Sequence, residues 1–291
     1  MNQVYELKTL KAEIRRQIHL PESGEVEAIS TWLLEHYLPV SRNDVLLNRT
    51  VEISALQQEQ LTAAIARINQ QEPVQYVLGE AYFYGRRFIV DPTVLIPRRE
   101  TEELVALVIQ ENRRAKLRML DIGTGSGCIA ISLQQEMNQA EVHALDISAA
   151  AIEVARKNAA LYQAEASFEV GDIFENGLSI SGPLDIIVSN PPYVRPSEAA
   201  DMADRVLRYE PHQALFVGEE QPLLYYERIA TLGQRWLRPG GKIYCEINEG
   251  MGEELRYLLQ THGFSAVKLH QDLQGKSRFI SGKLAKPSLS S

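Results

Sequence analysis

Four consecutive residues, Asn190-Pro191-Pro192-Tyr193, directly follow an apolar segment, 184–189, that we expect to be a strand. Their types suit methyl transfer to an amide or amine nitrogen, which must be oriented because its lone pair is delocalised. The Asn190 side-chain oxygen and the Pro191 carbonyl can accept hydrogen bonds from the two N–H groups. Prolines add no competing donor, and the Tyr193 ring can stack on the planar group and attract positive charge. The alternative is a rigid Pro-Pro turn without chemistry.

A second candidate site is a glycine-rich turn that comprises Gly123, Thr124, Gly125, Ser126 and Gly127. It lies between an expected strand, 117–121, and an expected helix, 129–137. Glycines permit a tight turn and let the backbone come close to a ligand. Ligands of open parallel sheets bind beyond the carboxyl ends of the strands, so the turn has the expected position for a binding site.

Asp146 ends the next expected strand, 141–146, and lies about 20 residues beyond Gly123, the spacing at which an acid can accept both hydrogen bonds of a ribose diol. This pattern fits NAD, FAD or S-adenosylmethionine. The glycines follow the spacing Gly-x-Gly-x-Gly, whereas dinucleotide-binding turns have G-x-G-x-x-G. We therefore favour S-adenosylmethionine, which has no pyrophosphate for a helix N-terminus to hold.

Three further residues are candidates for binding. Asp172 follows a third expected strand, 167–170, and can accept a hydrogen bond from an adenine amino group, with Ile173 flanking the ring. The alternative for Asp172 is a helix-capping or turn aspartate. Arg98 can position a cofactor carboxylate or a substrate loop; alternatively it only pairs with the nearby Glu100 or Glu102.

Helices and strands are expected to alternate from about residue 100 to residue 281. The expected helices are 100–116, 129–137, 148–161, 222–237 and 253–261. The expected strands are 117–121, 141–146, 167–170, 184–189 and 242–247, with 266–269 and 277–281 as a closing hairpin. This alternation predicts an α/β fold with a mainly parallel sheet covered by helices on both faces. Glu246 ends one of these strands near the candidate site, where a structural role is as plausible as a functional one.

The first part of the chain has a different pattern. Apolar residues recur at three- and four-residue spacing, as in Leu7, Leu10 and Ile14, and Ser41 and Ser54 can cap helices. We expect a helical domain without strands at 1–72, a β-hairpin linker at 73–92 and the α/β domain at 93–285.

Composition excludes several functional classes. The chain has 291 residues, a net charge of −8 and two cysteines without zinc-ligand spacing. The negative charge argues against binding of bare nucleic acid, which depends on Lys and Arg. Neither a signal-peptide pattern nor an apolar run of about 20 residues is present. We expect a cytoplasmic monomer that binds neither a metal nor a membrane.

The motifs together resemble class I, Rossmann-type amino-methyltransferases, which include adenine-N6 DNA methyltransferases and glutamine-N5 protein methyltransferases. Further segments resemble the peptide chain release factor glutamine methyltransferases, the HemK/PrmC family. These segments are Pro73-Val-Gln-Tyr-Val-Leu-Gly79, Leu95-Ile-Pro-Arg98 with Glu100-Thr-Glu102, and Tyr209-Glu-Pro211 with Ala214-Leu215. The resemblance covers about residues 73–281 and also fits the helical N-terminal part.

The resemblance implies a seven-stranded methyltransferase sheet, S-adenosylmethionine as cofactor, and as substrate the glutamine of the Gly-Gly-Gln motif in class I release factors. It implies that the N-terminal domain docks this partner. Gly123–Gly127, Asp146, Ile173 and Asn190 would contact the cofactor, and Asn190–Tyr193 would hold the glutamine. Two other hypotheses stay open: an adenine-N6 methyltransferase of nucleic acid, and a binding module without catalysis.

Three residues depart from the family pattern. Arg99 stands where the family usually has a second proline in Ile-Pro-Arg-Pro-Glu-Thr-Glu. Asn248 and Met251 stand where it usually has Glu-Ile-Gly followed by a glutamine. These departures leave the transfer motif intact and concern the rim of the expected pocket.

Overall fold

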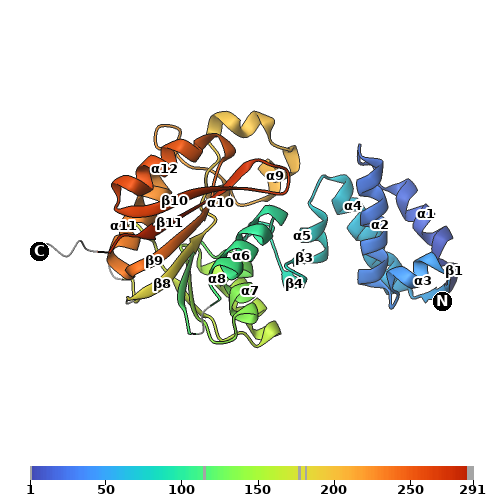
Figure 1. Cartoon of the computed structure of the whole chain (residues 1–291). Coiled ribbons are helices and arrows are strands. Elements are labelled where there is room, and N and C mark those ends of the chain that lie inside the picture. The colour runs from blue at the N-terminus through green and yellow to red at the C-terminus, as the bar shows by residue number, and fades with distance from the viewer. Residues whose placement is uncertain (1, 114–115, 176–177, 181, 287–291) are drawn as a thin grey trace, which may run out of the picture. The chain divides into compact units, whose positions relative to one another are not determined.

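The computed structural model describes residues 2–113, 116–175, 178–180 and 182–286 (Figure 1). The chain forms two compact units. The first comprises residues 1–80 together with 203–209, and the second comprises residues 81–202 and 210–291. Among the described residues, no helix combines the length and the apolar character needed to cross a membrane.

The first unit is mainly helical and has one small sheet. Its elements are β1 (Gln3–Glu6), α1 (Leu7–Gln17), α2 (Ser23–Tyr37), α3 (Arg42–Leu46), β2 (Thr50–Ile53), α4 (Ala55–Asn69), α5 (Val74–Leu78) and α9 (Asp204–Tyr209). β1 and β2 pair antiparallel, with Gln3 opposite Ile53. The prediction of a unit without strands is therefore wrong. Val51 and Ile53 are buried while Thr50 and Glu52 are exposed, so the alternation typical of a strand is present but short.

Two serines begin helices of the first unit as predicted. The Ser41 hydroxyl accepts a hydrogen bond from the backbone N–H of Asp44, and Ser54 accepts one from Gln57; both belong to reciprocal capping boxes. The helices bury apolar stripes against one another, including Leu7, Leu33, Leu61 and Ile68.

Helix α9 comes from the second half of the sequence but packs in the first unit. The Tyr209 hydroxyl donates to the backbone carbonyl of Gln70 at 2.9 Å, and Arg205 pairs with Glu25. Residues 203–209 thus belong to the first unit, although the residues before and after them in the sequence belong to the second unit.

The linker region differs from the predicted hairpin. Val74–Leu78 forms the short helix α5, which ends at Gly79 with a φ of +72°. The strands β3 (Glu80–Phe83) and β4 (Arg86–Ile89) then form a two-stranded sheet. The hairpin prediction is therefore correct only for its second half.

The second unit contains a seven-stranded sheet with the order β10-β11-β9-β8-β5-β6-β7. Its strands are β5 (Arg118–Ile122), β6 (Glu141–Asp146), β7 (Ser167–Val170), β8 (Leu184–Ser189), β9 (Leu237–Glu246), β10 (Phe264–Gln271) and β11 (Ser277–Leu284). The strands from β9 to β7 pair in parallel, and the hairpin of β10 and β11 adds two antiparallel strands at one edge. The predicted α/β fold with a mainly parallel sheet is confirmed.

Helices cover both faces of this sheet (Figure 1). They are α6 (Arg99–Glu111), α7 (Cys128–Glu136), α8 (Ala149–Tyr162), α11 (Leu224–Trp236) and α12 (Gly252–Thr261). The short helix α10 (His212–Leu215) and the 3-10 turns η1 (Pro196–Asp201) and η2 (Glu249–Met251) belong to the same unit. Successive strand residues point to opposite faces. Ile187 packs in the same apolar cluster as Ile229 of α11, whereas its neighbour Val188 packs with Leu104 of α6 and Ile131 of α7.

The order of the strands determines where a ligand can bind. β5 comes first in the sequence, β6 and β7 lie on one side of it, and β8 and β9 lie on the other. Successive strands are therefore added on one side of β5 up to β7 and on its other side from β8 onward, so the order reverses between β5 and β8. In open α/β sheets, ligands bind at the carboxyl ends of strands at such a switch point.

Candidate active site

A cavity of about 450 Å³ lies beyond the carboxyl ends of β5, β6, β7 and β8. This volume is in the range of small-molecule sites, roughly 300–1,000 Å³. The predicted site residues that line it are Gly123, Gly125, Asp146, Asp172, Ile173, Asn190, Pro191 and Pro192. Other predicted residues, namely Thr124, Ser126, Gly127, Tyr193 and Arg98, are not among its lining residues.

The glycine-rich turn is attached to the end of β6. The backbone N–H groups of Gly123 and Thr124 both donate to the carbonyl of Leu145, at 2.9 and 3.1 Å. Gly123 and Gly125 have φ values of +73° and +53°, and a Cβ atom added at either position would meet nothing within 4 Å. These two glycines line the cavity and leave their backbone open to a ligand.

Gly127 has a different role in the same turn. Its φ is +80°, and an added Cβ would lie 3.0 Å from the Ile131 side chain and 3.1 Å from the Ala155 Cβ. It is thus a packing glycine, which lets the start of α7 approach α8.

Behind the turn lies Asp121, which sequence reasoning did not identify. Its carboxylate is fully buried and accepts a hydrogen bond from the Thr124 hydroxyl at 2.7 Å. Burial raises the pKa of Asp121 to about 7, although the bond from Thr124 works in the opposite direction. Thr124 therefore shapes the turn through Asp121. The sequence signal that could have identified Asp121 is an acidic residue inside an apolar strand just before the glycines.

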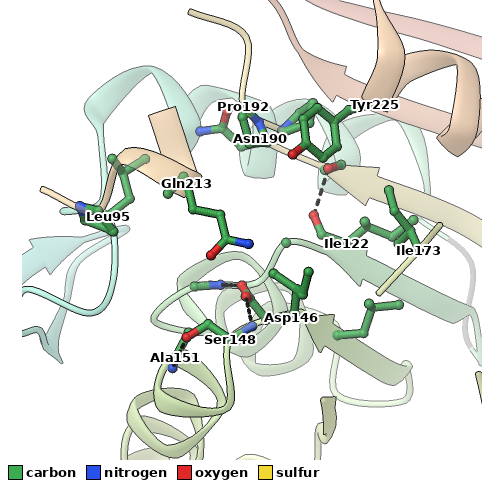
Figure 2. A pocket seen from close by; sticks show the side chains of 18 of the residues that line it. Leu95, Ile122, Asp146, Ser148, Ala151, Ile173, Asn190, Pro192, Gln213 and Tyr225 are labelled. Atoms are coloured by element: carbon green, nitrogen blue, oxygen red, sulfur yellow. Dashed lines mark hydrogen bonds between the residues drawn. The ribbon is translucent and has the colours of Figure 1, made fainter. Parts of the chain in front are cut away.

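Asp146 is held by two backbone groups. One carboxylate oxygen accepts from the N–H of Gly125 at 2.9 Å, and the other accepts from the N–H of Ser148 at 2.9 Å. Each oxygen of a carboxylate can accept more than one hydrogen bond, so Asp146 keeps capacity for two hydroxyl donors. Figure 2 shows Asp146 on one side of the cavity and Asn190 on the other, with Gln213 reaching between them.

Asp172 makes a local turn as well as lining the cavity. Its carboxylate accepts from the N–H of Phe174 at 2.8 Å, which fits the turn-aspartate alternative, yet a ligand can still reach it. Ile173 is buried, and the rings of Phe174 and Tyr225 meet edge to face at 5.6 Å. Together they form an apolar wall suited to a flat aromatic group.

Hydrogen bonds connect the transfer motif to two buried residues. The Asn190 side-chain nitrogen donates to the Thr101 hydroxyl oxygen at 3.1 Å, and that hydroxyl donates to Glu246 at 2.6 Å. The Tyr193 hydroxyl donates to the other Glu246 oxygen at 3.2 Å. Burial raises the pKa of Glu246 to about 7, and it also raises the pKa of Tyr193, so the phenol stays protonated. Sequence reasoning left Glu246 undecided and did not single out Thr101.

Arg98 pairs with a residue far away in the sequence. Its guanidinium lies 2.6 Å from a Glu210 oxygen, and the other Glu210 oxygen accepts from the N–H of Ile96 at 3.2 Å. The alternative, in which Arg98 only pairs with the nearby Glu100 or Glu102, does not hold, because the partner is Glu210. The pair joins two segments that line the cavity through Leu95 and Pro211.

The departures from the family pattern have definite contacts. The Asn248 side chain accepts from the N–H of Gly250 at 3.0 Å and donates to Glu198 at 3.2 Å. Met251 is buried in the apolar cluster beside α12, and Arg99 is the first residue of α6. Asn248 thus adds a link between the end of β9 and η1.

The cavity fits a nucleoside cofactor. Asp146 suits a ribose diol, the apolar wall suits a base, and the open glycine backbone allows close approach. Within the described part of the chain, no group of three His, Cys, Asp or Glu side chains is arranged to hold a metal ion.

Several known proteins with similar sequences are named release factor glutamine methyltransferases. The release factor glutamine methyltransferase of Bacteroides thetaiotaomicron is 44% identical over 265 residues, which cover 91% of this chain and 94% of that protein. The one of Flavobacterium psychrophilum is 40% identical, covering 89% of this chain and 92% of that protein. The chain belongs to the release factor glutamine methyltransferase family.

Two family models match separate parts of this methyltransferase: the PrmC N-terminal domain at residues 13–79 and the methyltransferase small domain at residues 101–215. A solved methyltransferase structure from Pyrococcus furiosus has a TM-score of 0.53 and 18% identity, and the match covers 80% of this chain and 100% of that one. That likeness concerns the Rossmann-type fold.

Proposed function

We propose that this enzyme transfers the methyl group of S-adenosylmethionine to the side-chain amide nitrogen, N5, of the glutamine in the Gly-Gly-Gln motif of class I peptide chain release factors. The observation that carries the proposal is the position of Asn190, which lines the cavity across from Asp146 while its side-chain nitrogen is bound to Thr101. The Asn190 oxygen is thereby left for an N–H donor in the cavity.

The cofactor supplies an electrophilic methyl group on its sulfonium. In the proposed mode, Asp146 accepts hydrogen bonds from the ribose hydroxyls and Asp172 from the adenine amino group. Ile173 and Phe174 contact the adenine ring, and the open backbone of Gly125 approaches the cofactor. These roles agree with the carboxylates and apolar side chains that line the cavity.

The substrate amide needs acceptors for both of its N–H bonds. In the proposed mode, the Asn190 side-chain oxygen takes one and the Pro191 carbonyl takes the other, which aims the nitrogen lone pair at the methyl group. Both acceptors also stabilise the positive charge that the nitrogen gains. Pro192 carries no N–H to compete. The methylated nitrogen then loses a proton readily, so no strong base is required.

Tyr193 and Arg98 are each held by a buried glutamate in this proposal. The Tyr193 hydroxyl is bound to Glu246, so the ring keeps a fixed position from which one face can contact the substrate amide. Arg98 acts through Glu210, because that ion pair holds two segments of the cavity edge.

We also propose that the first unit docks the release factor, and that the enzyme acts as a monomer in the cytoplasm, where its substrate works. Direct nucleic-acid binding is not part of the proposal, because the net charge of −8 opposes it. The match of a PrmC N-terminal domain model to residues 13–79 supports a family-specific role for this unit.

The test is a transfer assay with isotopically labelled S-adenosylmethionine and an unmodified class I release factor, followed by peptide mapping with mass spectrometry. We expect one methyl group on the Gly-Gly-Gln glutamine. The Asn190→Ala variant should transfer only at a low residual rate, and a release factor with glutamate in place of that glutamine should receive no methyl group. Label on another residue, or label only when DNA replaces the factor, would overturn the proposal.

A further inference from the structure

Two buried polar residues, Thr101 and Glu246, meet the partly buried Asn190 of the transfer motif. Thr101 lies in the first turn of α6, Glu246 is the last residue of β9, and Asn190 directly follows β8. The exposed fractions of Thr101 and Glu246 are 3% and 1%. Polar groups buried to this extent need hydrogen-bond partners, and each of these finds its partner among the other two.

The hydrogen bonds have a direction that the chemistry of the groups imposes. When Glu246 is ionised, above its pKa of about 7, its carboxylate can only accept, so it takes the single hydroxyl hydrogen of Thr101, at 2.6 Å. The Thr101 oxygen then presents only lone pairs to Asn190. The end of the Asn190 amide that faces it at 3.1 Å must therefore be the NH₂ group. The amide oxygen points the other way.

Glu246 is itself held in place. The Tyr193 hydroxyl donates to its second carboxylate oxygen at 3.2 Å, and the Tyr226 hydroxyl donates to its backbone carbonyl at 3.0 Å. One carboxylate thus connects to Asn190 through Thr101 and directly to Tyr193, the first and last residues of the motif.

We propose that Thr101 and Glu246 are positioning residues for methyl transfer: the chain of hydrogen bonds from Asn190 through Thr101 to Glu246 keeps the Asn190 oxygen turned toward the substrate nitrogen. This inference rests on the proposed function of the same site. A flipped Asn190 amide would present NH₂ to the substrate N–H, and two donors facing each other cannot form a hydrogen bond.

The proposal predicts the effect of removing one link. Thr101→Val keeps the shape of the side chain but offers no acceptor to Asn190, whose amide can then turn over. We expect kcat to fall by about 10- to 100-fold, in line with the loss of one oriented group at a reacting centre. The dissociation constant of S-adenosylmethionine should change less than about threefold, because Asp146 and the apolar wall are unchanged. Thr101→Ser keeps the hydroxyl and should restore kcat to within about threefold.

A double-mutant cycle separates this role from general stability. If Thr101 acts through Asn190, adding Thr101→Val to Asn190→Ala should lower the residual rate no further. Thr231 of α11 provides a matched control, since its hydroxyl bonds to the carbonyl of Glu227 at 2.9 Å outside the cavity. Thr231→Val should leave kcat unchanged.

Single-turnover rates, calorimetric binding of S-adenosylmethionine and thermal melting would be measured for each variant. A Thr101→Val variant with wild-type kcat, or losses that multiply in the double variant, would overturn the positioning role. If Thr101→Val does not fold, Thr101→Ala replaces it in the same cycle. The wild-type assay is read first, and methylation at another site by the wild type would count against the proposed function. If the wild type transfers normally but the double-mutant cycle gives one of the contrary results above, only the positioning role is contradicted.

Discussion

The guanidinium of Arg98 and the carboxylate of Glu210 lie 2.6 Å apart although 112 residues separate them in the sequence. Glu210 is almost completely buried, and its second oxygen accepts the N–H of Ile96. The pair joins the segment before α6 to the segment before α10, and both segments line the cavity.

Removing Arg98 should therefore lower the stability of the folded protein. Arg98→Ala leaves the Glu210 carboxylate buried without its cation, and we expect a loss of about 2–4 kcal/mol in the free energy of unfolding. Urea denaturation followed by circular dichroism measures it. Arg98→Ala/Glu210→Gln removes the orphaned charge and should recover part of the loss. A single variant as stable as the wild type would contradict the bridging role.

Asp146 should dominate the affinity for the cofactor. Asp146→Asn keeps the size of the side chain but loses the charge and one acceptor oxygen. Because hydrogen bonds to charged groups contribute about 1.5–3 kcal/mol, the dissociation constant of S-adenosylmethionine should rise by about 10- to 100-fold. Isothermal titration calorimetry checks this. Glu153→Gln, on the exposed face of α8, serves as control and should bind like the wild type. Equal affinities of the two variants would exclude the assigned role.

Gly125 and Gly127 belong to one turn, but their replacement by alanine should lower the stability of the protein by different amounts. Gly127→Ala combines a φ of +80° with contacts near 3.0 Å to Ile131 and Ala155, so we expect a loss of at least about 2 kcal/mol in stability. Gly125→Ala has open space and only the backbone strain of a positive φ, about 1 kcal/mol. Thermal melting of both variants tests the order, and a Gly125 variant less stable than the Gly127 variant would contradict it.

Stability should depend on pH through Asp121. Its pKa is about 7 in the folded protein because of burial, above the ordinary value of 3.8. The folded state thus binds more protons than the unfolded state between these values, so this contribution is fully present below pH 4 and is lost as pH rises through 7. In the Asp121→Asn variant the side chain at this position does not titrate, so this contribution is absent.

The melting temperature of the wild type minus that of Asp121→Asn should therefore fall steadily between pH 5 and pH 8. Differential scanning fluorimetry at four pH values measures this difference. A difference that stays constant, or that grows with pH, would show that Asp121 is not protonated preferentially in the folded state.

Sequence patterns predicted the α/β sheet because parallel strands such as β5 and β8 contain short, contiguous apolar runs. They also predicted the glycine turn, Asp146 and the Asn-Pro-Pro-Tyr segment as a group, since each lies at the end of a strand or directly after one, and parallel strands end at one edge of the sheet. The strands β1 and β2 were not predicted, because a four-residue strand has too few alternations to stand out from helical neighbours.

The chain alone determined which residue types could perform the chemistry and at which ends of strands they lie, because hydrophobic periodicity and local motifs are properties of neighbouring residues. Only the tertiary structure decided the partners of those residues. Thr101 meets Asn190, Glu246 meets Tyr193, and Arg98 meets Glu210 rather than its neighbours. Such pairs bring together residues 53 to 112 positions apart, and their meeting depends on how helices and strands pack, which local spacing does not encode.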